Sequence, residues 1–285
     1  MIAAHQSPPS PRPRWSEGLG NPAAAVLIVA AFVWRLLSAH SRFLNADEAM
    51  HYLLARQPSF MDAYRASLGT AHPPLLIILL YYWTRISSTE FFLRFPSVIA
   101  GTASGWFLYR WLRLVRDRGT ALIAMALLLF SPALIYTSAE VRQYALALGF
   151  MSAALYLLER ALMANSALLM LASAVSLYLA LWTHYSALIF AASIAVYGLV
   201  RIASAHSNLP VIAVWSLSQA GAAGIATFLW KTHIGLIRHR SLIQDVAESY
   251  LRSSLFHPRQ ENVFVFLLGS NLRLFHFLFS QGAVS

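Results

Sequence analysis

The residues best suited to chemistry are the adjacent acids Asp47 and Glu48, which follow the first strongly apolar stretch of the chain. Only 11 of the 285 residues are acidic, so two neighbouring carboxylates are unusual in this sequence. Like charges that lie close together and partly out of water raise the pKa of one of them. A carboxyl group adjusted in this way can act as a general base toward a hydroxyl group. The alternative interpretation is a pair of solvated loop charges, because loops are where charges normally lie.

A second polar group, Glu140, Arg142 and Tyr144, occupies alternate positions between two apolar stretches. In an extended loop the three side chains would point the same way. The planar guanidinium of Arg142 suits paired hydrogen bonds to a phosphate, which would neutralise that phosphate without a metal ion. The alternative is an interfacial ion pair between Glu140 and Arg142.

Three further residues are weaker candidates when each is taken alone. His72 precedes two prolines, a pattern that also begins a helix. His184 and Tyr185 follow an apolar stretch, where aromatic residues commonly mark a membrane interface. Each pattern by itself is more typical of a structural feature than of a site.

Several familiar site motifs are missing from the sequence. It contains no Gly-x-x-x-x-Gly-Lys, Gly-x-Gly-x-x-Gly, His-Glu-x-x-His, Gly-x-Ser-x-Gly or Asp-x-Asp motif, and no cysteine. A nucleotide-driven or zinc mechanism is therefore not expected. We expect no cofactor and no metal site; a divalent ion is not indicated.

The composition is that of a membrane protein. Hydrophobic residues make up 58% of the chain and charged residues 11%, against about 25% charged in soluble domains. The net charge is +10, but the arginines lie at the ends of apolar stretches rather than on one face. We therefore expect contacts with membrane lipids and lipid phosphate, and no nucleic-acid partner.

Apolar stretches of about 20 residues predict an all-α, polytopic transmembrane bundle with about eight spans. The predicted spans are residues 22–39, 94–112, 119–136, 145–163, 166–182, 186–202, 210–230 and 263–281. The stretch 75–83 is too short to span, which predicts a re-entrant or interfacial helix. Two glycine pairs predict close helix packing; they are Gly101 with Gly105 and Gly221 with Gly224.

The charge distribution predicts the orientation of these spans. Residues 1–22 are rich in proline and arginine, which predicts a disordered cytoplasmic tail ahead of one transmembrane domain at 23–285. Arg35 would reach water from the outer end of the first span. By the positive-inside rule, the densest arginine cluster is cytoplasmic; it comprises Arg110, Arg113, Arg116 and Arg118. The first loop, with Asp47, and the long loop 231–262 would then lie outside.

The order of the motifs is more informative than any single motif. Along the chain they are Asp47-Glu48, His72-Pro73-Pro74-Leu75, Leu93-Arg94-Phe95-Pro96-Ser97, Ser131-Pro132, Glu140-x-Arg142-x-Tyr144 and Thr183-His184-Tyr185. This series resembles the membrane-embedded C-type glycosyltransferases. It is most similar to the bacterial branch near the protein O-mannosyltransferases and the lipid A aminoarabinose transferase. The resemblance covers residues 24–197.

The resemblance implies a sugar donor carried on a polyprenyl phosphate and bound at the periplasmic or extracellular side of the bacterial cytoplasmic (inner) membrane. It implies inverting transfer to a hydroxyl group of a glycolipid, glycan or protein acceptor. Asp47 would be the general base with Glu48 beside it, and His72 and Arg142 would contact the donor phosphate. The remaining substrate-binding candidates are Glu140, Tyr144, His184 and Tyr185.

Two other classes of function remain open at this point. A transporter or flippase of lipid-linked sugars would place ionisable groups at the membrane centre, whereas most charges here lie at span ends. A truncated, non-catalytic membrane subunit is the other alternative. Two observations suggest this alternative. The last apolar stretch is broken by Asn271 and Arg273, and relatives usually continue for more spans. A fragment, a C-terminally truncated form and a minimal form of the family all remain open.

Overall fold

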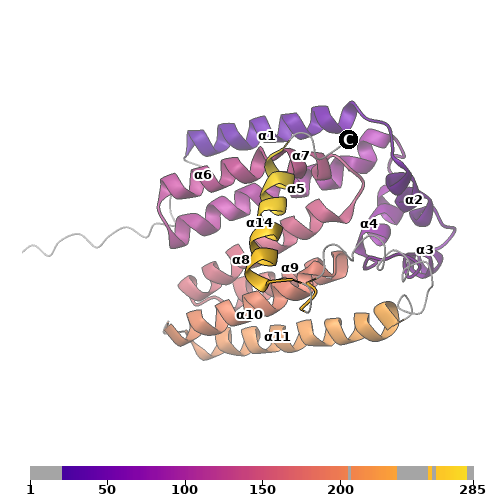
Figure 1. The fold of residues 1–285 in the computed structure, drawn as a ribbon. Helices are drawn as coiled ribbons and strands as arrows, with labels where there is room; N and C mark the ends of the chain where they lie inside the picture. Colours follow the sequence, from indigo (N-terminus) through magenta and orange to yellow (C-terminus); the bar gives the residue numbers. More distant parts are fainter. Residues whose placement is uncertain (1–20, 205–206, 236–255, 259–260, 281–285) are drawn as a thin grey trace, which may run out of the picture.

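The computed structural model describes residues 21–204, 207–235, 256–258 and 261–280. All the regular elements in these ranges are helices, which confirms the predicted all-α class. Most of the long helices lie roughly side by side, and three short helices gather at one end of them (Figure 1). Of the predicted tail, residues 1–20 lie outside the described part; Asn21 caps the first helix, which begins at Pro22.

The first half of the bundle is built from α1 (Pro22–His40), α5 (Glu90–Val115), α6 (Arg118–Leu129) and α7 (Pro132–Ser138). The predicted glycine contacts on α5 are confirmed. A Cβ added at Gly101 would lie 2.1 Å from the Ser138 hydroxyl, and one at Gly105 would lie 2.4 Å from a Leu129 methyl carbon. The missing side chains therefore let α5 pack closely against α6 and α7.

The second half contains α8 (Gln143–Ala164), α9 (Ala167–Thr183), α10 (Ser186–Ser204), α11 (Leu209–Leu229) and α14 (Val263–Phe279). Gly221 of α11 makes the predicted close contact, since an added Cβ would lie 2.1 Å from the Tyr178 hydroxyl. The prediction for Gly224 is wrong, because nothing lies within 4 Å of a Cβ there. The loop predicted from residue 231 begins later, because α11 continues as the π-helix η2 (Trp230–Ile234); residues 236–255 and 259–260 lie outside the described part.

The described helices support a multi-pass membrane protein, but not the predicted count of eight spans. Four are long and apolar enough to cross a membrane: α1, α8, α10, and α11 together with η2. A fifth span results if α6 and α7 are counted as one. The predicted span at 119–136 is formed by two helices with a bend of 59° between them, because Pro132 has no N–H and Ser131 caps a new helix there. The apolar helices α9 and α14 are shorter.

Three short helices, which we call the end layer, connect α1 to α5: α2 (Ala46–Ala55), α3 (Phe60–Ser67) and α4 (Leu75–Trp83). The nine residues of α4 rise about 14 Å, which is less than half of the roughly 30 Å hydrocarbon core. This helix packs against α2 and α3. As predicted, the stretch 75–83 does not form a span.

Arg35 does not reach toward water as predicted. Its side chain is fully buried, and Nη1 donates a hydrogen bond to the Ala31 carbonyl at 3.2 Å. The Arg35 side chain is buried because its guanidinium points into the contact between α1 and α5, where Nε would lie 3.4 Å from a Cβ added at Gly101.

Candidate active site

The start of α2 fixes the two adjacent acids in different directions. The Asn45 side chain accepts the Glu48 N–H at 2.9 Å, and the Glu48 carboxylate accepts the Asn45 N–H at 3.1 Å. This reciprocal capping box holds the first turn of the helix. Successive side chains on a helix point about 100° apart. Asp47 and Glu48 therefore enter different environments.

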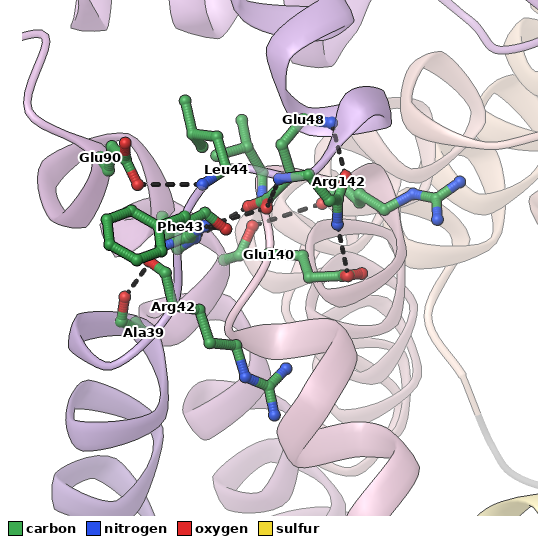
Figure 2. A network of polar contacts seen from close by, with 12 residues as sticks. Ala39, Arg42, Phe43, Leu44, Glu48, Glu90, Glu140 and Arg142 are labelled. Atoms are coloured by element: carbon green, nitrogen blue, oxygen red, sulfur yellow. Dashed lines mark hydrogen bonds and ion pairs between the residues drawn. The ribbon is translucent and has the colours of Figure 1, made fainter. Parts of the chain in front are cut away.

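Glu48 is 1% exposed and forms a two-point ion pair with Arg94 of α5. Arg94 Nε lies 2.8 Å from Oε1, and Nη2 lies 2.9 Å from Oε2. The Val141 N–H also donates to Oε1 at 2.8 Å. The remaining Arg94 donors bind the carbonyls of Ala39, Arg42 and Phe43. One buried pair thus joins the end of α1, the start of α2, α5 and the turn before α8 (Figure 2).

The expected rise in pKa from two neighbouring carboxylates does not occur at Glu48. Burial acts to raise the pKa of Glu48. The hydrogen bonds from Arg94, Val141 and Asn45 together have the larger effect and hold this pKa below its ordinary value. Glu48 is therefore a fixed, ionised and fully engaged carboxylate. Its geometry suits positioning rather than proton transfer.

Asp47 is the accessible acid of the pair. Its side chain is 55% exposed, and Oδ2 lies 3.1 Å from Nη2 of Arg142. The Arg142 guanidinium also lies over the Tyr144 ring, 5.0 Å from its centroid. The Nε atom of Arg142 is buried and has no hydrogen-bond partner. The extended loop that would align Glu140, Arg142 and Tyr144 is not formed, because Tyr144 stands in α8.

Asp47 and Arg142 line a cavity of about 380 Å³, which we call the α2 cavity. One wall is a face of α2 with Asp47 and His51, and another is the segment of residues 66–72, including His72. The cavity thus gathers a carboxylate, a guanidinium and two imidazoles from parts of the chain up to 95 residues apart.

His72 belongs to an aromatic cluster beside the α2 cavity. Its ring stacks on His184 with centroids 5.4 Å apart and meets Tyr144 edge-on at 6.4 Å. Burial and the neighbouring His184 lower the pKa of His72 to about 4, and burial also lowers that of His184. Both imidazoles are therefore neutral at pH 7. His72 can offer a hydrogen bond to a ligand but not a full positive charge.

His51 is a cavity residue that the sequence reasoning missed. It is 2% exposed, lines the cavity, and its Nδ1 has no hydrogen-bond partner. Burial and the charge of Arg142 lower its pKa. Its spacing of four residues from Asp47, on one helix face, is the signal that could have identified it.

Glu140 and Tyr185 do not line this cavity. The Glu140 carboxylate accepts a hydrogen bond from the Asn45 side chain at 3.0 Å, and burial raises the pKa of Glu140. The ion pair considered between Glu140 and Arg142 is replaced by the Asp47–Arg142 pair. The Tyr185 hydroxyl is hydrogen-bonded to His233 of η2. Glu140 therefore supports the start of α2, whereas Tyr185 connects the end of α9 to η2.

The described residues contain no cluster of three or more histidine, aspartate or glutamate side chains arranged to hold a metal ion.

The chain matches the model of a known protein family. The model described as dolichyl-phosphate-mannose-protein mannosyltransferase matches residues 71–230. These residues include His72, Arg142 and His184, whereas Asp47 and Glu48 precede them. A comparison with curated proteins found no match.

Proposed function

Because the chain belongs to the dolichyl-phosphate-mannose-protein mannosyltransferase family, we propose that it moves a sugar from a polyprenyl-phosphate donor to a hydroxyl group of a glycolipid, glycan or protein acceptor. The observation that carries this proposal is the Asp47–Arg142 pair at the α2 cavity, with 3.1 Å between the charged atoms. One member can accept a proton and the other can hold a phosphate. Sugar transfer from a lipid phosphate requires both.

In the proposed reaction, the Asp47 carboxylate takes the proton of the acceptor hydroxyl while that oxygen attacks the anomeric carbon. The bond between the anomeric carbon and the phosphate oxygen breaks, and its electron pair leaves with the lipid phosphate. Attack opposite to the leaving group inverts the configuration. Asp47 then releases its proton to water, which its exposed position favours.

Arg142 would stabilise the charge that develops on the departing phosphate. A guanidinium forms two parallel hydrogen bonds to phosphate oxygens, and Arg142 lines the α2 cavity. Since this charge is supplied by the protein itself, we propose that transfer needs no metal ion. Turnover in the presence of EDTA, at the level measured without it, is the expected result.

The neutral imidazoles would contact the sugar rather than the phosphate. His51 and His72 line the cavity and can each donate and accept hydrogen bonds to sugar hydroxyls. Tyr144 and His184 form the aromatic wall behind His72. Glu48 would act only by holding α2, and Glu140 by holding Asn45.

We propose that the α2 cavity faces the outer side of the bacterial cytoplasmic membrane. The supporting observation is the distribution of arginines along α5. Arg94 binds Glu48 where α5 meets the end layer, whereas Arg110 and Arg113 lie in the last turns of α5. The end layer lies at one end of the long helices (Figure 1). The positive-inside rule then assigns the arginine end to the cytoplasm.

The deciding experiment measures release of lipid phosphate. Purified protein in nanodiscs is mixed with short-chain polyprenyl-phosphate sugars and a panel of glycolipid and peptide acceptors, and the products are identified by mass spectrometry. Asp47→Asn should lower turnover by about 10²- to 10⁴-fold, because it removes the base and keeps the shape. Asp62→Asn is the matched control, since Asp62 is an acid of α3 that pairs with Arg65 and does not line the cavity.

Unchanged turnover in Asp47→Asn would remove this residue from the mechanism. Donor binding without release by the wild type would favour the alternatives, a transporter of lipid-linked sugars or a non-catalytic subunit.

A further inference from the structure

A second cavity, of about 230 Å³, opens between α2 and α4. It uses a different face of α2. Residues 47, 51 and 54 face the α2 cavity, whereas residues 52, 55 and 56 face the second one. No residue lines both cavities. We call the second one the arginine cavity, because Arg56 and Arg85 line it.

Tyrosines hold both guanidinium groups in place. Arg56, at the end of α2, donates a hydrogen bond from Nη1 to the Tyr52 hydroxyl at 2.9 Å. Arg85, which follows α4, donates to the Tyr81 hydroxyl and lies over that ring, 4.2 Å from its centroid. Each guanidinium has five N–H donors, so these bonds occupy only a small part of its capacity.

The arginine cavity carries positive charge without a matching acid. In the described part of the chain, neither Arg56 nor Arg85 forms an ion pair with a carboxylate. Its other polar lining side chains are neutral; they are Gln57, Thr84 and Ser88. Two guanidinium groups that line one cavity with hydroxyl and amide donors are suited to binding phosphate oxygens.

Apolar side chains surround this charged cavity. Ile86 is 70% exposed and follows Arg85 directly, and Tyr82 is 52% exposed. The exposed ring of Phe60 lies 6.2 Å from those of both Tyr81 and Tyr82. Arginines among exposed aromatic and aliphatic side chains are typical of the region where lipid headgroups meet hydrocarbon. A phosphate bound here would therefore be carried on a lipid.

We propose that the arginine cavity binds the phosphate group of an anionic lipid at the membrane interface, as a site separate from the α2 cavity. Two lipids could supply that phosphate: a phospholipid headgroup, which is a phosphodiester, or a free polyprenyl phosphate, which is a monoester.

Native mass spectrometry of the detergent-purified chain tests this site. Phosphatidylglycerol, a short-chain polyprenyl phosphate and inorganic phosphate are added in separate arms. The wild type should retain one of the two lipids, and the lipid retained more tightly identifies the source. Arg56→Gln and Arg85→Gln should each weaken retention roughly fivefold, as expected for removing one interfacial arginine. Binding of inorganic phosphate alone, with neither lipid retained, would overturn the proposal.

Matched variants distinguish a specific phosphate-binding site from nonspecific electrostatic attraction of anionic lipids. Arg65→Gln removes an arginine of the same end layer that is already paired with Asp62, and should leave retention unchanged. Changing both Arg56 and Arg85 to Lys keeps the charge but loses the planar fork, and should weaken retention nearly as much as Gln does. Equal losses in Arg65→Gln, or full retention in the double Lys variant, would contradict the proposal.

The result does not depend on the proposed sugar transfer. The same measurement on Asp62→Asn protein should give the wild-type retention, because Asp62 lies on α3 and lines neither cavity. A protein without transferase activity could still pass this test, and an active transferase could fail it.

Discussion

Asp47 and Glu48 are adjacent in the chain, yet their carboxylates pair with different arginines from different helices. Glu48 is sealed against Arg94 of α5, whereas Asp47 meets Arg142 at the start of α8, beside a cavity. The first pair is almost completely buried and the second is partly exposed. The two acids should therefore give opposite results when each is neutralised.

Glu48→Gln should destabilise the protein by about 3–5 kcal/mol, because it leaves the buried Arg94 without its counter-charge. Asp47→Asn should change stability by about 1 kcal/mol or less, as is usual for an exposed pair. Thermal melting of both variants in nanodiscs measures the difference. Equal melting temperatures would mean that the Glu48–Arg94 pair does not hold the end layer.

Arg142→Lys should lower donor turnover about tenfold or more, because lysine keeps the charge but loses the two-point contact with phosphate. Saturation kinetics with a short-chain donor will locate the loss in KM, in kcat or in both. Arg65→Lys serves as the control, since Arg65 lies on α3 and does not line the α2 cavity. A lysine variant with wild-type kinetics would exclude the proposed phosphate contact.

The stability of the protein should fall as the pH is lowered from about 6.5 to about 4. His72 in the folded protein takes up a proton only near pH 4, whereas an ordinary histidine of the unfolded chain does so near 6.5. Between these values the unfolded state binds more protons, so acid favours unfolding. As the pH is lowered across this range, the melting temperature of the wild type should fall more than that of His72→Gln. Parallel curves would show that His72 does not contribute.

Gly101→Ala should destabilise the bundle by about 1–3 kcal/mol, because the new methyl group would lie 2.1 Å from the Ser138 hydroxyl. Gly224→Ala provides the control on α11, where nothing lies within 4 Å and the alanine favours the helix. Ser138→Gly should recover much of the stability lost at position 101. The absence of any recovery would place the strain elsewhere.

The sequence was sufficient for the features that depend on local pattern. Long apolar stretches predicted the helical membrane class, and the small residues at Gly101 and Gly105 predicted close packing. The acid at Asp47 and the arginine at Arg142 were identified by residue type, and the structure places both at one cavity.

Features that depend on distant partners could not be predicted in this way. Glu48 and Arg94 lie 46 residues apart, so nothing near either residue indicates that they pair. The same limit explains why Glu48 was considered as a neighbour of the base rather than as a support of α2. The direction of the Arg35 side chain could not be predicted either, because the space beside Gly101 that it occupies exists only when α1 packs against α5.

The hydrogen bonds of Arg94 determine which wall of the α2 cavity can move. Through Glu48 and three carbonyls at the end of α1, this arginine joins α1, α2 and α5 into one rigid frame. Among the described residues, the opposite wall at 66–72 has no such buried ion pair, and the Thr70 hydroxyl forms hydrogen bonds only with the nearby backbone of Ser67 and His72. Entry of a bulky lipid-linked sugar should therefore displace the 66–72 segment and leave Asp47 fixed. The reacting carboxylate would keep its position while the opening adapts to the substrate.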